Sequence, residues 1–214
     1  MSEQDGAGPN SAGIDGLERA IRARAAANLV VDELLCRAAT ASGIRLAVLV
    51  EGRSDAAALT ALAGRLGRDL GAEGAIVIPM GGAMSAARFF RVVGPDGLGW
   101  RVAGLCDAGE RSPFDRLLAA EAVFACQRDL EEELLRALGV ERAEAVLEAQ
   151  GDLARFRTFQ RQPAQRGRSP QAQLHRFLGS VGGRKERYAA ALVGAFDLNE
   201  VPPPLDRLLA SVGR

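Results

Sequence analysis

Four short apolar runs alternate with segments of helical spacing along the first two thirds of the chain. The runs are RLAVLV (45–50), AIVIP (75–79), WRVAGLC (100–106) and AVFAC (122–126), and a helix-like segment follows each of them. A continuous apolar run is typical of a strand that is covered on both faces. Strand–helix alternation therefore predicts an α/β fold with a parallel or mostly parallel four-stranded sheet flanked by helices.

The regions on either side of this core are predicted to be helical extensions. Apolar positions recur on one helical face from Ile14 to Leu35, so we expect a single N-terminal helix over 14–43 that ends at Gly43. Residues 1–13 are polar and glycine-rich and are predicted to be a disordered lead-in. We expect the α/β core over 44–140 and a helical C-terminal region over 141–214 that completes the domain.

Composition excludes several classes of protein. The 214 residues are 48% hydrophobic, and 27 acidic and 27 basic side chains cancel. No apolar stretch reaches about 18 residues and no signal peptide is recognisable, so we expect a cytoplasmic protein without a membrane span. The three cysteines match no zinc spacing, and a single histidine, His175, excludes a histidine-rich metal site. We interpret His175 as a packing or surface residue of a helix.

Carboxylates follow three of the four predicted strands. They are Glu51 and Asp55 after the first, Asp107 and Glu110 after the third, and Asp129 and Glu131 after the fourth. Ligands of a parallel sheet bind outside the carboxyl ends of its strands, and oxygen ligands suit Mg²⁺ or Mn²⁺. Each residue taken singly also fits a helix cap or an acidic first turn. The agreement of three strand ends is what predicts a metal site, with room for two ions that clamp a phosphoryl transfer.

Basic residues gather in the C-terminal part. Residues 152–187 carry nine basic and two acidic side chains, whereas residues 105–149 carry eleven acidic and five basic ones. This asymmetry suggests a phosphate site beside a cation site, although two solvated helix faces would also explain it. The candidate nucleic-acid contacts are Arg155, Arg157, Arg161, Arg166 and Arg168.

Lys185 is the only lysine of the chain, beside 26 arginines. Its occurrence is either chance or the sign of a position that needs a compact ammonium group. Such a charge could stabilise the transition state of phosphoryl transfer.

These segments resemble a known family of metal-dependent enzymes. VLVEGRSD is similar to the first motif of the Toprim domain, and GLCDAGE is similar to its second. The closer likeness is to the Toprim domains of OLD (overcoming lysogenization defect) family nucleases, to which RDLEEELLRALG and GGRKERYA correspond, over about residues 45–195.

The resemblance implies a Mg²⁺- or Mn²⁺-dependent endonuclease that cleaves nucleic acid, with DNA the expected substrate, through two metal ions. It implies that Glu51, Asp55 and Asp107 bind metal, that Asp129 and Glu131 complete the second site, and that Lys185 is the catalytic cation. The family's Asp-x-Asp is here Asp107-Ala108-Gly109, so Glu110 would have to substitute for the second Asp.

That departure leaves an alternative open. The chain would then be a catalytically weakened Toprim module that binds nucleic acid or a separate ATPase. OLD proteins join this domain to an ATPase, and this chain has no Walker motif of its own, so a separate ATPase partner is one expectation. The apolar helix over 14–43 could also form a homodimer.

Overall fold

A four-stranded sheet lies at the centre of the computed structural model, which describes residues 11–180 and 183–213. The strands are β1 (Leu46–Val50), β2 (Ala75–Pro79), β3 (Arg101–Asp107) and β4 (Val123–Cys126). All three pairings are parallel and the order is β2-β1-β3-β4, with Val50 opposite both Pro79 and Leu105. The predicted fold class is confirmed.

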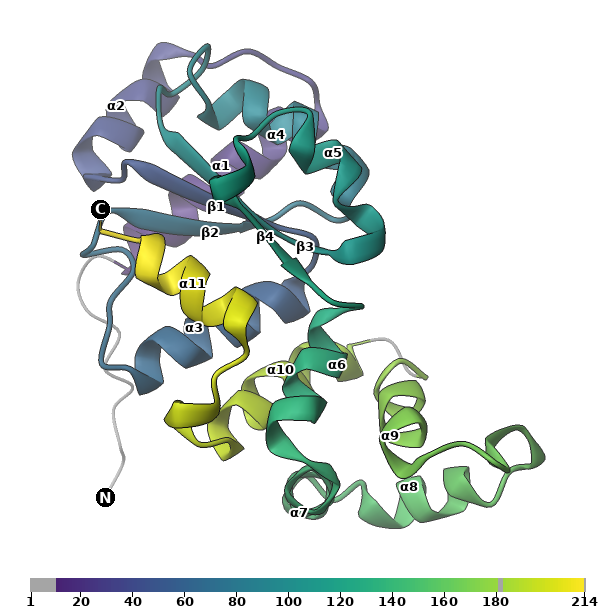
Figure 1. Cartoon of the computed structure of the whole chain (residues 1–214). Helices are drawn as coiled ribbons and strands as arrows, with labels where there is room; N and C mark the ends of the chain where they lie inside the picture. The colour runs from purple at the N-terminus through teal and green to yellow at the C-terminus, as the bar shows by residue number, and fades with distance from the viewer. Residues whose placement is uncertain (1–10, 181–182, 214) are drawn as a thin grey trace.

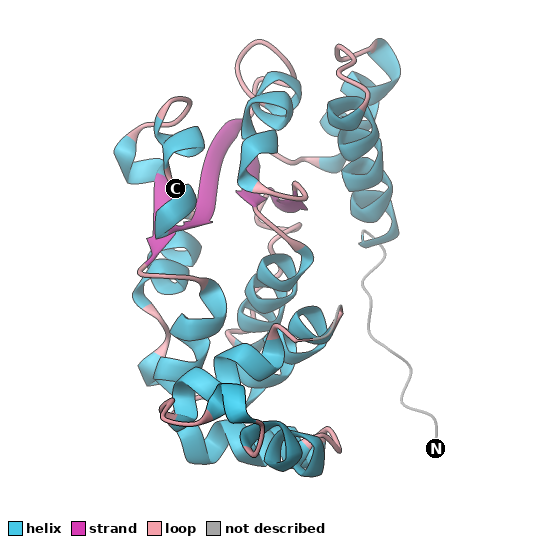
Figure 2. Ribbon diagram, turned by 90° about the vertical axis from the view of Figure 1, so that its right-hand side faces the viewer, coloured by secondary structure: helices cyan, strands magenta, loops and turns pink. Residues whose placement is uncertain are grey.

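Helices cover both faces of the sheet because successive residues of β1 point to opposite sides. Leu46, Val48 and Val50 pack into a core with α3 (Arg53–Arg65), α10 (Arg184–Ala195) and α11 (Pro203–Ser211). Ala47 and Leu49 pack into the opposite core with α1 (Ser11–Ala26), α2 (Glu33–Ser42), α4 (Ala86–Val93) and α5 (Ser112–Asp115). Figure 2 shows the strands between these helical layers.

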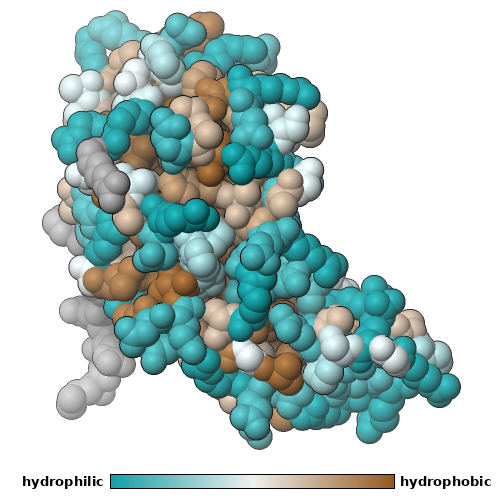
Figure 3. All heavy atoms as spheres, viewed as in Figure 1, coloured by the Kyte–Doolittle hydropathy of each residue, from teal (hydrophilic) through white to brown (hydrophobic). Residues whose placement is uncertain are grey.

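Four further helices extend from the end of β4 and give the molecule an angular outline (Figure 1). They are α6 (Leu130–Leu138), α7 (Val140–Ala149), α8 (Leu153–Gln160) and α9 (Pro170–Leu178). We call α7, α8 and α9 the helical arm. Figure 3 shows a deep indentation between the sheet part and this arm. The visible surface of the arm is mainly hydrophilic. The carboxyl ends of β3 and β4 are directed toward the inner corner of that indentation (Figure 1).

The N-terminal region differs from the prediction of one helix over 14–43. The structure has two helices, α1 and α2, because the chain turns between them. Asn28 adopts a left-handed conformation with φ 54°, which asparagine tolerates better than most residues. Asp32 then accepts a hydrogen bond from the Leu35 N–H at 2.9 Å and caps α2, and Gly43 ends it as predicted.

The predicted lead-in over 1–13 lies mostly outside the described residues. Its last part is helical, since α1 begins at Ser11. Among the described helices, none has the length and apolar character needed to cross a membrane. The division of the chain into a core and a C-terminal region stays a prediction.

Candidate metal centre

Glu51 and Asp107 meet at the carboxyl ends of the two central strands. Glu51 directly follows β1, and Asp107 is the last residue of its neighbour β3. The backbone N–H of Asp107 donates a hydrogen bond to Oε1 of Glu51 at 2.8 Å. The side chain of Glu51 is thereby held across the end of β3, beside the carboxylate of Asp107.

The loop after β2 fixes the peptide that carries Glu51. The backbone N–H groups of Gly81 and Gly82 both donate to the carbonyl of Glu51 at 2.9 Å. Gly81 has φ 76° and Gly82 has φ 120°, values that favour glycine because it lacks a Cβ. These two glycines therefore fix the strand end that carries the first carboxylate.

Asp55 lies in the first turn of α3, where it also serves as a cap. Its Oδ2 accepts a hydrogen bond from the backbone N–H of Gly52 at 2.7 Å. Burial, followed by the nearby carboxylates of Glu131 and Asp129, raises the pKa of Asp55 to about 6 against the opposing charge of Lys185. Asp55 is thus both a helix cap and a member of the carboxylate cluster.

The protonation behaviour of Glu51 and Asp107 reflects this crowding. Burial raises the pKa of Glu51 to about 8, and the Asp107 charge and a hydrogen bond with the Glu110 carboxyl add to the effect, while the Asp107 N–H opposes it. Burial likewise raises the pKa of Asp107 to about 7, with further contributions from Asp55, Asp129 and Glu131. Asp107 therefore interacts electrostatically with Glu51 and also with Asp55, Asp129 and Glu131.

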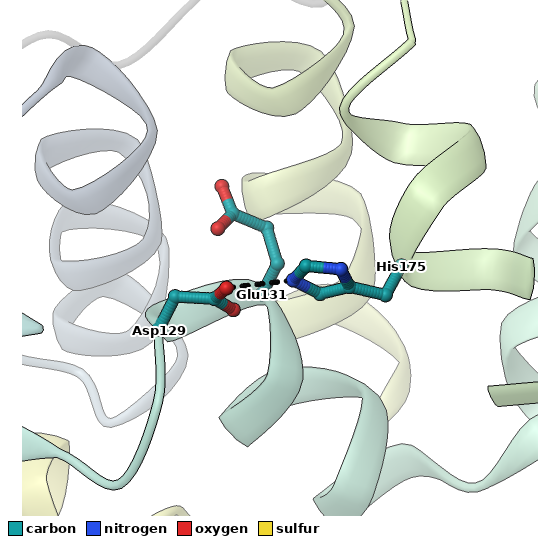
Figure 4. A group of neighbouring side chains, drawn as sticks. All are labelled: Asp129, Glu131 and His175. Carbon is teal, nitrogen blue, oxygen red and sulfur yellow. Dashed lines mark hydrogen bonds and ion pairs between the residues drawn. The ribbon is translucent and has the colours of Figure 1, made fainter. Parts of the chain in front are cut away.

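The other half of the cluster comes from the start of α6 and from two distant helices (Figure 4). Asp129 caps α6 by accepting the Glu132 N–H on Oδ1 at 2.8 Å, and its Oδ2 lies 2.7 Å from Nε2 of His175. Glu131 is buried, and its Oε2 accepts a hydrogen bond from Nζ of Lys185 at 3.1 Å. The single histidine and the single lysine of the chain thus both lie at this site.

Hydrogen-bond and charge partners keep Asp129 and Lys185 in their charged forms. Burial alone would raise the pKa of Asp129, but hydrogen bonds from His175 and from the Glu132 N–H outweigh it and leave the pKa below its usual value. Burial would lower the pKa of Lys185, but the carboxylates of Glu131, Asp129 and Asp107 raise it instead. Lys185 is accordingly held as a cation beside the cluster.

His175 is the site residue that sequence reasoning left out. It lies in α9, 46 positions after Asp129, and no spacing connects the two. The only available signal was compositional, because His175 is unique in the chain in the same way as Lys185.

The five candidate phosphate-binding arginines lie on α8 and the loop that follows it, away from the carboxylates. Arg155 pairs with Asp152 and Arg157 pairs with Glu144. Arg161 donates to the Thr158 hydroxyl, Arg168 donates to the Ala164 carbonyl, and Arg166 is exposed. They form a basic stretch on the helical arm rather than part of the carboxylate cluster.

The donor set fits hard divalent cations. Three carboxyl groups whose pKa values are raised by burial and mutual repulsion gain most from a nearby cation. Oxygen-rich sites of this kind suit Mg²⁺ and Mn²⁺. Glu51, Asp107 and Glu110 could hold one ion, and Asp55, Asp129 and Glu131 another.

Comparisons with known proteins give one family match and several similar folds. Residues 45–108 match the family described as "Overcoming lysogenization defect protein-like, TOPRIM domain", a range that includes Glu51, Asp55 and Asp107. The fold is similar to the C-terminal region of the Burkholderia pseudomallei OLD protein, with a TM-score of 0.59, 20% identity and coverage of 79% of this chain and 96% of that chain. It is also similar to the C-terminal region of the Xanthomonas campestris pv. campestris OLD protein, with a TM-score of 0.58, 22% identity and coverage of 79% and 95%. A comparison with curated proteins gave no match.

Proposed function

Because the chain carries an OLD-like TOPRIM domain, we propose that it is a Mg²⁺- or Mn²⁺-dependent nuclease that hydrolyses phosphodiester bonds, with DNA as the expected substrate. The observation that carries the proposal is the gathering of carboxylates from the end of β1, the first turn of α3 and the start of α6 around Asp107, whose pKa rises to about 7 through burial and through Asp55, Asp129 and Glu131. A cluster of this kind is suited to divalent ions rather than to a protein-only acid–base mechanism.

The chain's own groups have distinct roles in this proposal. Two bound ions would supply Lewis-acid stabilisation of the attacking and leaving oxygens of the phosphodiester. Glu51 and Asp107 hold the first position at the ends of the central strands, and Glu131 with Asp129 holds the second. Lys185 brings a positive charge to the same point through its 3.1 Å contact with Glu131, where it can stabilise charge that develops on the phosphoryl oxygens.

Glu110 is proposed to replace the missing second Asp of the Asp-x-Asp motif. The Glu110 carboxyl is near enough to Glu51 to help raise the pKa of that residue, which supports this assignment. Glu110 follows the strand end in a short 3₁₀ turn, Ala108–Glu110, that carries it back over the end of β3. The longer side chain can compensate for its position one residue later.

The indentation between the sheet part and the helical arm supports nucleic acid as the substrate class (Figure 3). The carboxyl ends of β3 and β4 are directed toward its inner corner (Figure 1), and the arginines from Arg155 to Arg168 lie on the arm. Basic residues placed away from the reacting centre bind phosphates by charge, without reading sequence. We propose that a nucleic acid strand passes along the arm and reaches the cluster at the corner.

Nicking of supercoiled plasmid in Mn²⁺ or Mg²⁺ tests the proposal. Glu51→Gln and Lys185→Ala should each reduce nicking by at least about 100-fold, since each removes a group that acts on the transition state. Glu121→Gln and Arg207→Ala alter exposed charges elsewhere and serve as matched controls. Full nicking by both Glu51→Gln and Lys185→Ala would overturn the assignment.

The sequence Asp107-Ala108-Gly109 favours one second candidate, a weakened module that binds nucleic acid or a separate ATPase without cutting. Calorimetric titration with Mn²⁺ in the presence of DNA separates the two functions. The nuclease should bind two ions for each chain, whereas the weakened module should bind one or none and show no nicking.

A further inference from the structure

A nitrogen donor stands among the oxygen donors of the metal centre. Nε2 of His175 lies 2.7 Å from Oδ2 of Asp129. One donor atom each from Asp129, Glu131 and His175 lies within 4.8 Å of the others. Figure 4 shows the imidazole edge directed at the Asp129 carboxylate, with the Glu131 carboxylate above this pair. Two donor atoms bound at right angles to one ion stand about 3 Å apart, given bonds of about 2.1 Å, so the 2.7 Å between Nε2 of His175 and Oδ2 of Asp129 is close to the spacing at a shared ion.

We propose that His175 is a further protein ligand of the ion held by Asp129 and Glu131 together with Asp55, and that this nitrogen makes the position selective for Mn²⁺ and similar transition metals over Mg²⁺. The inference rests on the proposed metal-dependent nuclease and deepens it. Imidazole suits first-row transition metals, whereas Mg²⁺ prefers oxygen ligands. The position at the ends of β1 and β3, with Glu51, Asp107 and Glu110, has no such nitrogen and stays an all-oxygen site. The two positions should therefore differ in metal preference.

The surrounding structure presents the imidazole at a defined place. Ser169 and Pro170 start α9, where the Ser169 hydroxyl accepts the Ala172 N–H at 3.2 Å. On the same helix Leu174 and Phe177 are buried, and the Phe177 ring packs edge-on against Phe156 at 5.2 Å. His175 itself retains 17% of its side-chain exposure, enough for an ion to approach. A ligand that is already positioned loses little entropy on binding.

The hydrogen bond between His175 and Asp129 is compatible with this role. An imidazole binds a metal through a nitrogen without hydrogen, so the coordinating tautomer carries its hydrogen on Nδ1. Oδ1 of Asp129 stays engaged with the cap of α6, which leaves Oδ2 and Nε2 together as the donor pair. Coordination would replace their mutual hydrogen bond without moving either helix.

The alternative role for His175 is to act only as a charge partner of Asp129. In that case the imidazole would orient the carboxylate and would not touch the ion. A spectroscopic measurement of what is bound to the metal separates the two roles.

The single histidine makes the test unambiguous. Electron spin echo envelope modulation of Mn²⁺ reports directly bound imidazole nitrogen, and in the tag-free chain only His175 can give that signal. Wild type, His175→Ala, His175→Gln and the exposed-neighbour control Arg176→Ala would be loaded with less than one Mn²⁺ per chain. Affinities for Mn²⁺ and Mg²⁺ would be measured on the same proteins by titration and by competition.

The proposal expects nitrogen modulation in wild type and Arg176→Ala, and none in the two His175 variants. It also expects Mn²⁺ affinity at this position to fall by about tenfold or more without the imidazole, with a smaller change for Mg²⁺. Mn²⁺ binding without nitrogen modulation in wild type would overturn the role of His175 while leaving the nuclease proposal standing. Nitrogen modulation without any nicking would support the role of His175 and overturn the nuclease proposal. Absence of Mn²⁺ binding would overturn both.

Discussion

The hydroxyl of Tyr188 donates a hydrogen bond of 3.0 Å to Oδ2 of Asp152, and the two residues are 0% and 1% exposed. Asp152 precedes α8, and its carboxylate also pairs with Arg155 and Arg187. Tyr188 lies on α10, three residues after Lys185, so this buried contact connects the helical arm to the helix that presents the catalytic lysine candidate. α10 itself packs against α3 and α6, so the contact adds a buried polar link from this helix to the start of α8.

Loss of the Tyr188 hydroxyl should weaken this connection. Tyr188→Phe is expected to lower the free energy of unfolding by about 1–2 kcal/mol, because a buried hydrogen bond to a charged group is lost. Arg155→Ala removes an exposed partner of the same carboxylate and should cost at most about 1 kcal/mol. Urea unfolding of both variants measures the difference, and equal losses would contradict the special role of the buried contact.

The metal-free protein should lose stability as pH rises. The pKa of Glu51 is raised from an ordinary 4.5 to about 8 by burial first, so between these values the folded chain holds a proton that the unfolded chain has released. The free energy of unfolding therefore falls across this range, and Asp107, with a pKa raised to about 7 by burial, adds to the fall.

Thermal unfolding in chelator should thus occur at a lower temperature near pH 9 than near pH 6. A loss of about 1 kcal/mol corresponds to about 2–4 °C for a chain of this size. Glu51→Gln cannot ionise and should show a shallower dependence on pH. A slope unchanged by Glu51→Gln would mean that this carboxyl does not titrate as inferred.

Gly82 should resist substitution for conformational reasons alone. An added Cβ would meet nothing within 4 Å, but the residue has φ 120°, which other residues rarely adopt. Gly82→Ala is expected to cost about 1–3 kcal/mol of stability and to loosen the hydrogen bond to the Glu51 carbonyl. Gly109→Ala, at a position with open space and no such φ, is the control that should change stability little.

Gly109→Asp should strengthen divalent-ion binding. The substitution restores an Asp-x-Asp sequence after β3, and the space around Gly109 is open. One more carboxylate at the strand end is expected to raise Mn²⁺ affinity by about tenfold. Glu110→Gln should lower it, and calorimetric titration of both variants tests whether Glu110 has taken over the place of the second Asp. If Mn²⁺ affinity rises in Gly109→Asp but does not fall in Glu110→Gln, Glu110 has not taken over the place of the second Asp.

The strands and the meeting of the carboxylates could be predicted because they follow local rules. Continuous apolar runs such as LAVLV form buried parallel strands, and parallel strands bring the residues after them to one edge. Glu51 and Asp107 lie together for that reason. The helices of the arm were also predictable, since Ser169–Pro170 and Gly139 mark their limits.

The remaining features depend on long-range packing that has no sequence period. The break between α1 and α2 depends on Asn28, the one residue other than glycine with a positive φ in the described part of the chain, inside a segment whose apolar spacing suits one helix. The contact of His175 with Asp129 depends on how α9 packs against α6, which local patterns do not encode. Sequence reasoning therefore located the strand ends and missed the partner that arrives from a distant helix.

The order in which the groups occur along the chain has a consequence for synthesis. Glu51 leaves the ribosome early, whereas Lys185 leaves only after α6, α7, α8 and α9 have been made. A growing polypeptide that has reached the end of α6 carries its carboxylates without the ammonium group that accompanies them. The carboxylates and this ammonium group can therefore come together only after the start of α10 has been translated.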